Sequence, residues 1–500
     1  MERRRRLAVA VLVLGLCMLI RPPVAAQDSN GPLTRVPKLL KTLQNDGFEV
    51  LEGRFLVLNP IPKACQSMWL PSAFYNNVQP YLTINLPADW EKAGRALPPT
   101  YLLRQDEAIV IVGTTPVPMA YFSFQTFLFS RYNPATYGWD PATGGFYAPQ
   151  EVLFAYLGDT VNHLTIRTTG TTPFNRPMAF ISTGNRQTQE GIRAALRAAG
   201  YADAIVNTET LPSSLVRFGY DERADQFLYL FRTAIATGGD ASMKAFQQQM
   251  TAGTLMRVFR VRPKSEFPVD PLPAPVLRTH GTGRTEMDMF PAMEKLRQAV
   301  LDQNADGYTA EELDTYLPDS LPEGYPAIQR DVAYLGPMYE GSLGYGRDAR
   351  YLVSPWFDLG EDDFALIYGV DHAATGKATY SSASVYLDKT LWAGISGADS
   401  GDFAAHPGTA SAYLPGEPGI DKFFVWKVAR NCHGDPTCAE ASLEYQYKDK
   451  YPECNGTVPP RIGPDAPIRL AFRAYAEPAT RVGPADRELL YERVIVFRKK

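Results

Sequence analysis

Residues 106–128 read DEAIVIVGTTPVPMAYFSFQTFL, and residues 362–386 read DDFALIYGVDHAATGKATYSSASVY. Both stretches contain an acidic pair, an apolar run, a glycine, a polar turn, and then an aromatic residue, a serine and an alternating strand. Two further echoes follow in the same order. One strand ends at Phe231-Arg232 and its counterpart at Phe472-Arg473, and the closing segments are RVFR at 257–260 and RVIVFR at 493–498. Self-similarity in a fixed order indicates a duplicated structural unit.

The strand patterns of the two halves predict the fold class. Ala108 to Val112 is continuously apolar, as expected for a strand buried on both faces, and Tyr121 to Phe129 alternates with period two. Many short strands with few helices predict a mainly β protein with α decoration. We expect two tandem related β-sandwich or jelly-roll-like domains joined by a helical insert. The alternative is one composite sandwich built from both halves.

Composition shifts and breakers divide the chain into five segments. The clearest helix begins near Thr188 and is expected to end at Gly200, and the predicted insert holds helices at Met287–Val300, Ala310–Leu317 and Pro326–Leu335. The predicted segments are a signal peptide (1–26), an N-terminal extension (27–49), a first β-rich repeat domain (50–262), a Pro-rich linker with the helical insert (263–344) and a second β-rich repeat domain (345–500).

The N-terminus and the overall charge predict where the protein works. Arg3 to Arg6 precede an apolar run, and Val24-Ala25-Ala26 suits cleavage, so a secretory signal peptide is expected and the protein should be secreted or periplasmic. An uncleaved anchor is the alternative. No later stretch is apolar enough to span a membrane. The formal net charge of −4 argues against nucleic acid and anionic membranes as partners.

Four cysteines follow the signal peptide, and export makes disulfides plausible. We expect a disulfide between Cys432 and Cys438, which would close a short loop. Cys65 and Cys454 are left to pair with each other or to stay reduced. A metal site at Cys432 and His433 is the alternative, although the sequence lacks a matching second pair at zinc spacing.

The turn at 369–380 carries the densest group of chemically competent side chains. His372 has the side chain suited to proton transfer near neutral pH, with Asp371 placed to orient it. Lys377 and Tyr380 would stabilise developing negative charge. These four residues are the predicted catalytic set of a hydrolase or lyase. The alternative is an ordinary polar hairpin turn.

A Gly- and Pro-rich loop gathers aromatic residues that suit a different function. Tyr137, Trp139, Phe146 and Tyr147 would form a stacking platform for a polar, ring-containing ligand of the carbohydrate type. The alternative is that these rings fold back and pin a long loop. A small-molecule or glycan ligand is therefore expected, and the sequence makes no prediction of oligomeric state.

Residues 302–313, DQNADGYTAEEL, resemble an EF-hand calcium loop. Asp302, Asn304 and Asp306 stand at the first three ligand positions, and Gly307 stands at the sharp turn. The twelfth position is Leu313 where the family has a bidentate glutamate, so the resemblance implies weak calcium binding. The alternative is a capping box formed by Thr309 and Glu312. No cofactor other than calcium is predicted.

Two functions from different classes follow. The first is a binding protein that holds a carbohydrate-like ligand in loops or between the halves. The second is the hydrolase or lyase that uses the Asp371–His372 pair. The repeated arginines, Arg232 and Arg473 among them, are expected to serve ion pairs of the fold rather than substrate binding.

Overall fold

The computed structural model describes residues 31–58, 81–88, 90, 99–132, 138–140, 145–147, 150–317, 346–387, 393–441 and 466–500. The predicted signal peptide, Cys65, Cys454, Tyr137 and the helix expected at Pro326–Leu335 lie outside these residues. The described chain is mainly β, as predicted, and its strands form several sheets. No helix among the described residues is long and apolar enough to cross a membrane.

Two sheets form the first half of the molecule. The outer one has the order β1-β13-β4-β10-β11, with antiparallel pairs except for β10 and β11, which are parallel. The inner one has the order β2-β3-β12-β5-β8, with β9 also pairing with β5. The strands of the outer sheet are β1 (Phe48–Glu52), β4 (Ala108–Thr114), β10 (Pro177–Thr183), β11 (Val206–Thr210) and β13 (Met256–Pro263). Those of the inner sheet are β2 (Arg54–Leu58), β3 (Tyr81–Asn85), β5 (Met119–Tyr132), β8 (Gln150–Tyr156), β9 (Val161–Asn162) and β12 (Gln226–Ala236).

Two sheets also form the second half. The outer one has the order β14-β22-β16-β19-β20, again antiparallel except for its last pair, and the inner one has the order β15-β21-β17-β18. The outer strands are β14 (Tyr308–Leu313), β16 (Phe364–Val370), β19 (Phe423–Ala429), β20 (Cys438–Glu440) and β22 (Arg493–Lys499). The inner strands are β15 (Ala349–Val353), β17 (Tyr380–Leu387), β18 (Ala393–Asp399) and β21 (Ile468–Tyr475). The strands from the two quoted stretches, β4 and β16, each hold the middle place of an outer sheet.

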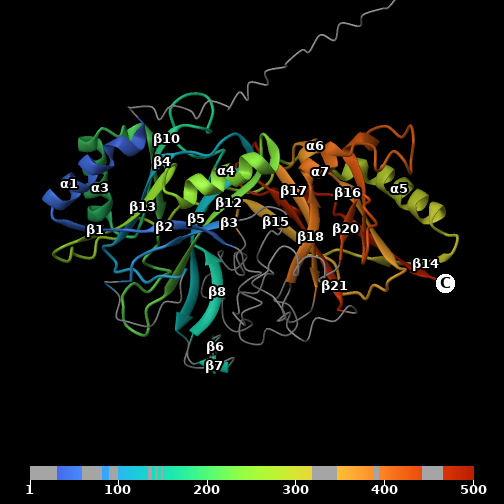
Figure 1. Ribbon diagram of the computed structural model, residues 1–500, viewed down its shortest axis with the longest axis horizontal. Helices are drawn as coiled ribbons and strands as arrows, with labels where there is room; N and C mark the ends of the chain where they lie inside the picture. Colours follow the sequence, from blue (N-terminus) through green and yellow to red (C-terminus); the bar gives the residue numbers. More distant parts are fainter. Residues whose placement is uncertain are drawn as a thin grey trace, which may run out of the picture.

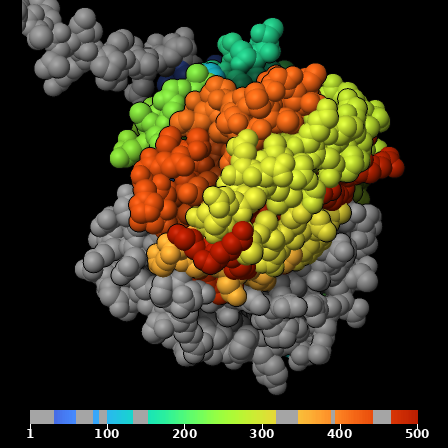
Figure 2. All heavy atoms as spheres, turned by 90° about the vertical axis from the view of Figure 1, so that its right-hand side faces the viewer, coloured from blue at the N-terminus to red at the C-terminus, as the bar shows by residue number. Residues whose placement is uncertain are grey.

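Helices cover the outer face of each outer sheet (Figure 1). Leu39 and Leu43 of α1 and Ile192 and Leu196 of α3 pack against the first outer sheet, and Leu296 of α5 packs against the second. Figure 2 looks at the side where the chain around α5, in yellow, lies across the surface. The helices are α1 (Val36–Asn45), α3 (Arg186–Ala199), α4 (Gly239–Thr251), α5 (Phe290–Gln303), α6 (His372–Thr375) and α7 (Ser400–Ala405). The short 3₁₀ turns are η1 (Pro32–Arg35), η3 (Asp203–Ile205), η4 (Met287–Met289), η6 (Ile420–Lys422) and η8 (Asp486–Glu488).

The helix predicted in the first half is confirmed as α3. The side chain of Asn185 accepts a hydrogen bond from the Thr188 amide and caps its first turn. Gly200 ends it with φ 97°, a left-handed conformation that glycine adopts without a steric penalty. The prediction for Ala310–Leu317 was wrong, since Tyr308–Leu313 is strand β14 and pairs along its whole length with β22. Pairing with the edge of β22 outweighed the helix propensity of residues 308–313.

The predicted segment boundaries cross these sheets. β1 begins at Phe48, inside the predicted extension, and pairs with β13. Helix α5 and strand β14 lie inside the predicted linker and insert, yet both belong to the outer layer of the second half. Periodicity along the chain does not show which sheet a flanking element joins.

A hydrophobic core fills the space between the outer and inner sheet of each half. In the first half the rings of Phe124 and Phe231 stack 4.4 Å apart, and Phe180 of the outer sheet packs against Phe124. In the second half Ile367 and Trp426 of the outer sheet share a core with Phe472 of the inner sheet. Gly113 and Gly369, which occupy matching places in the two quoted stretches, each allow a neighbouring strand to pass close to the backbone. A Cβ at Gly113 would lie 2.7 Å from the Cα of Met256, and one at Gly369 would lie 2.9 Å from the Cα of Glu492.

The two inner sheets face each other across the centre of the molecule (Figure 1). The Tyr121 ring lies 4.8 Å from the Tyr475 ring, and the Tyr81 and Tyr475 hydroxyls are 3.0 Å apart. Polar side chains join the halves as well, since Arg347 Nε donates to Asp159 Oδ1 over 2.7 Å. The layers therefore run helices, outer sheet, inner sheet, inner sheet, outer sheet, helix.

The predicted disulfide between Cys432 and Cys438 is present, with the Cα atoms 5.6 Å apart. It closes the loop between β19 and the parallel strand β20. Parallel neighbours usually need a crossover of a dozen or more residues, and helix α3 serves that purpose between β10 and β11. In the second half the disulfide holds a much shorter loop in place.

We predict that replacing Cys432 and Cys438 by alanine destabilises the protein by about 2 kcal/mol, the chain-entropy value for so short a loop. The loss should be local, because β20 is a short edge strand. Hydrogen exchange should show a faster-exchanging amide at Ala441, which donates to the Ala429 carbonyl over 2.7 Å. An unchanged exchange rate at Ala441 would contradict this role for the disulfide.

Candidate functional site

The predicted catalytic turn folds into a single helical turn. Asp371 caps α6, and its Oδ1 accepts from the Ala373 amide and from Ser381 Oγ, both over 3.0 Å. Gly376 ends the turn with φ 76°. Burial raises the pKa of Asp371 against the opposing effect of these hydrogen bonds. The Asp371 carboxylate therefore caps the first turn of α6, and the partners of the His372 ring are other residues.

His372 lies between two glutamates. Its Nδ1 is 2.9 Å from Glu286 Oε2, and its Nε2 is 3.2 Å from Glu492 Oε1. The imidazole is 1 % exposed. Burial alone would lower the pKa of His372, but the two carboxylates outweigh it and raise that pKa well above its ordinary value. Both ring nitrogens are therefore engaged by carboxylates, an arrangement that favours the imidazolium form.

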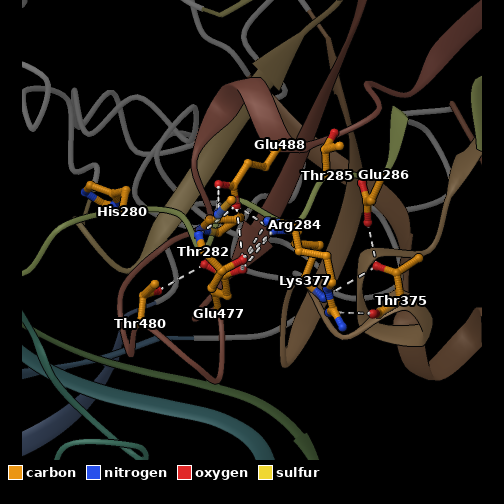
Figure 3. A network of polar contacts seen from close by, with 12 residues as sticks. His280, Thr282, Arg284, Thr285, Glu286, Thr375, Lys377, Glu477, Thr480 and Glu488 are labelled. Carbon is orange, nitrogen blue, oxygen red and sulfur yellow. Dashed lines mark hydrogen bonds and ion pairs between the residues drawn. The ribbon is translucent and has the colours of Figure 1, made fainter. Parts of the chain in front are cut away.

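Lys377 has three oxygen partners, one for each N–H of its ammonium group (Figure 3). Its Nζ is 2.6 Å from Glu488 Oε2, 2.9 Å from Glu477 Oε1 and 3.2 Å from Thr282 Oγ1. Glu488 also accepts from the amides of Thr282 and Gly283. Burial would raise the pKa of Glu488, but the Lys377 ammonium and these amides lower it to about 2.

These contacts form one structural assembly, which we call the linker clamp: Thr282, Glu286, His372, Thr375, Lys377, Glu477, Glu488 and Glu492. It ties the extended segment that follows the first half to α6 and to the chain that leads into β22 (Figure 3). Glu286 is the central carboxylate, because it also accepts from Thr375 Oγ1 and from the Leu490 amide. Burial raises the pKa of Glu286 but His372 and the hydrogen bonds lower it further.

The chemistry of the linker clamp suits a structural role. A general acid or base must exchange its proton with a substrate during turnover. His372 and Lys377 are each 1 % exposed and each lie between two carboxylates. Such an arrangement holds the protons in place. Sequence reasoning found the two cations but missed all four glutamates, because their partners lie 86 or more residues away.

Tyr380 is separate from the linker clamp. It lies in the interface between the inner sheets, where its ring centroid is 5.4 Å from that of Tyr475. Around it, each inner sheet carries a row of one tyrosine, one arginine and one serine on neighbouring strands, which we call a Tyr–Arg–Ser row. Arg232 is opposite Ser123, and its guanidinium is 5.5 Å from the Tyr81 ring. Arg473 is opposite both Ser382 and Tyr351, and its guanidinium is 5.7 Å from the Tyr351 ring.

The arginine and the serine of each row come from the echoes that the sequence repeats, whereas the tyrosines, Tyr81 and Tyr351, do not. Side chains that are opposite one another on neighbouring strands share a face of the sheet. The face here is the one turned away from the hydrophobic core, so the two rows meet in the central polar layer. The sequence singled out the arginines, but periodicity did not indicate that both would be buried there.

The predicted ligand-binding aromatics lie on a small separate hairpin. Its strands are β6 (Gly138–Asp140) and β7 (Gly145–Tyr147), and the register places Trp139 opposite Phe146 and Gly138 opposite Tyr147. Tyr137 falls outside the described residues. The hairpin stands at the far end of β8, beyond the body of the inner sheet (Figure 1).

Two of the predicted calcium ligands have partners within their own helix. Asp302 accepts from the Gln298 side chain, Asn304 donates to the Val300 carbonyl, and Asp306 is exposed. Strand β14 replaces the second flanking helix, and Glu312 pairs with Arg297. Among the residues that the structure describes, no group of three or more His, Cys, Asp or Glu side chains is arranged to hold a metal ion.

Comparison with known proteins adds little to this geometry. No family model and no curated protein matches the chain. Among solved structures, the chain is similar to an uncharacterised protein from Burkholderia cenocepacia, with a TM-score of 0.38 and 9% sequence identity over 93% of this chain and 87% of that one.

We predict that Lys377→Met destabilises the protein by about 3–5 kcal/mol, because it leaves two buried carboxylates facing each other without their cation. Thermal unfolding followed by circular dichroism measures the effect. The matched control is Lys295→Met, since Lys295 is 58% exposed and pairs with Glu417 at the surface. That variant should lose less than about 1 kcal/mol. Equal effects of the two substitutions would rule out the clamp as a stabilising element.

His372 should make the protein less stable as the pH rises into the alkaline range. Its folded pKa lies above its unfolded value, so the stabilisation is complete below about pH 6.5 and is lost as pH rises through the folded pKa. We expect His372→Gln to lower the melting temperature at neutral pH and to flatten its decline on the alkaline side. His433→Gln, in the exposed disulfide loop, should leave that decline unchanged. A steep decline that persists in His372→Gln would assign the dependence to another group.

Proposed function

We propose that this chain is a secreted or periplasmic protein of two tandem related β-sandwich domains that binds a polar, ring-containing ligand of the carbohydrate type. The ligand would be held at the aromatic hairpin β6–β7. The observation that carries the binding function is the register of that hairpin, which brings Trp139 opposite Phe146 on a short element set apart from the packed sheets. Aromatic residues grouped in this way suit contact with the apolar face of a sugar ring.

The domain relationship rests on correspondence between the halves. The two outer sheets share their strand order and their single parallel pair. The glycines that permit close strand approach and the Tyr–Arg–Ser rows occur at matching places. Descent of both halves from one ancestral unit accounts for all three observations.

Two observations support the proposed compartment. Residues 1–26 have the composition of a secretory signal, and the Cys432–Cys438 disulfide suits an oxidising environment. Both features agree with a site of action outside the cytosol.

The alternative function, a hydrolase or lyase that uses Asp371, His372, Lys377 and Tyr380, has weaker support. Asp371 caps a helix, His372 and Lys377 lie in the linker clamp, and Tyr380 faces the other inner sheet. His372, Lys377 and Tyr380 are buried, and Tyr380 lies in different surroundings from the other two. No common point of contact with a substrate follows from their placement.

A glycan array probed with the mature protein, followed by calorimetry on the glycans retained, tests the binding function. Trp139→Ala should weaken binding by roughly tenfold, as the loss of a stacked ring of about 1.4 kcal/mol implies. Trp139→Tyr keeps a ring and should retain most of the affinity. If no glycan is retained, or if Trp139→Ala binds as tightly as the wild type, the proposal is wrong. Turnover of a retained glycan that His372→Gln abolishes would instead support the enzyme.

A further inference from the structure

Arg473 differs from the other arginines that the described part of the chain buries. Most of these guanidinium groups have a carboxylate or backbone carbonyls as partners. Arg131 pairs with Asp225, Arg260 with Glu107 and Arg347 with Asp159, Arg430 donates to the carbonyls of Leu359, Ala441 and Ala466, and Arg469 donates to the Ser354 carbonyl and the Tyr316 hydroxyl. Arg473 is 3% exposed; among the described residues it donates to the hydroxyls of Ser384 and Tyr386, and its guanidinium lies over the Tyr351 and Tyr386 rings.

The donors of Arg473 are incompletely used. Nη1 donates to Ser384 Oγ over 2.9 Å, and Nη2 donates to the Tyr386 hydroxyl. Its Nε has no hydrogen-bond partner among the described residues, and neither has the Oγ of Ser382, which is directly opposite Arg473 on β17. Buried polar groups of folded proteins are nearly always hydrogen-bonded, so two such atoms on neighbouring residues require an explanation.

The matching arginine of the first half, Arg232, has a carboxylate near it. A Cβ built on Gly346 would lie 2.6 Å from Arg232 Nη1 and 2.7 Å from Asp348 Oδ1, so both groups lie close to this glycine. Burial raises the pKa of Asp348, and the nearby Arg232 charge opposes that rise. Asp348 is fully buried and accepts from Tyr121 and Thr160. In the other row, no carboxylate of the described residues pairs with Arg473.

A buried guanidinium without a counter-charge is costly, and an oxyanion is its best-matched partner. Guanidinium N–H groups bind carboxylate and phosphate oxygens in paired, charge-assisted hydrogen bonds. The groups beside Arg473 are hydroxyls, which also donate to oxygen anions.

We propose that Arg473 and Ser382 form a binding site for a small oxyanion, a carboxylate or a phosphate, in the polar layer between the two inner sheets. Nε of Arg473 and Oγ of Ser382 donate to the anion, and Ser384 and Tyr386 hold the guanidinium in place. This site is distinct from the aromatic hairpin and goes beyond the proposed function, so either can fail without the other.

Thermal shift of the full mature chain, dialysed into a low-salt buffer free of oxyanions, tests the proposal. Inorganic phosphate and acetate are titrated separately, with chloride at matched ionic strength as the reference. We expect a saturable rise in melting temperature with at least one of the two oxyanions, since a ligand that binds the native state stabilises it. Native mass spectrometry of the same sample detects an anion that is retained through purification.

Two variants assign the effect to the site. Ser382→Ala removes one donor and should weaken the anion response severalfold, and Arg473→Met should abolish it. Arg430→Lys is the control, because that buried side chain has carbonyl partners and should leave the anion response unchanged. If Arg473→Met does not fold, Ser382→Ala decides: an unchanged anion affinity overturns the proposal. A wild type with neither a saturable shift nor a retained anion overturns it as well.

Discussion

The structure depends on the burial of both faces of its two inner sheets. One face of each meets the hydrophobic core of its own half, and the other meets the inner sheet of the opposite half. Because side chains alternate along a strand, each strand of an inner sheet places one set of side chains in the hydrophobic core and the other set in the polar layer between the halves. On β5, Phe122 and Phe124 belong to the core, whereas Tyr121 and Ser123 belong to the central polar layer.

A polar interior between sheets is stable only where charges and donors find partners. Tyr121 and Thr160 donate to Asp348 across the boundary between the halves, and Arg347 pairs with Asp159. These contacts specify how the halves dock, since a shift of one inner sheet would leave several of them unmatched. The linker clamp extends the same principle to the chain between the halves. It places two buried cations between four glutamates and so holds the linker against α6.

This use of ionisable groups has a consequence for function. A histidine or lysine that exchanges protons readily in solution cannot do so when all its N–H groups are hydrogen-bonded to buried carboxylates or hydroxyls. The richest group of reactive side chains in the sequence, at 371–380, is therefore part of the framework in the structure. Recognition is better sought where the framework leaves polar or aromatic groups without such partners. Among the described residues, Nε of Arg473 and Oγ of Ser382 are such polar groups, and the proposed oxyanion site rests on them. The proposed ring-binding site at the aromatic hairpin is separate from them.

Several features followed from the sequence alone. Apolar runs and alternation predicted a mainly β fold, helical spacing with Gly200 predicted α3, and a short separation predicted the Cys432–Cys438 disulfide. Each depends on contacts within a few residues or on local periodicity, which a sequence displays directly. The echoes also marked Arg232 and Arg473 as related positions.

What only the tertiary structure decided are the partners that meet from distant segments. β14 is a strand because β22 offers it an edge, although its residues suit a helix. Glu286 and Glu492 reach His372 from opposite sides, and Asp348 lies near Arg232, whereas no carboxylate of the described residues pairs with Arg473. No local pattern records such pairings, because they join segments that lie 86 or more residues apart in the chain. Burial and charge compensation, and hence the roles of these side chains, are properties of the way these segments pack.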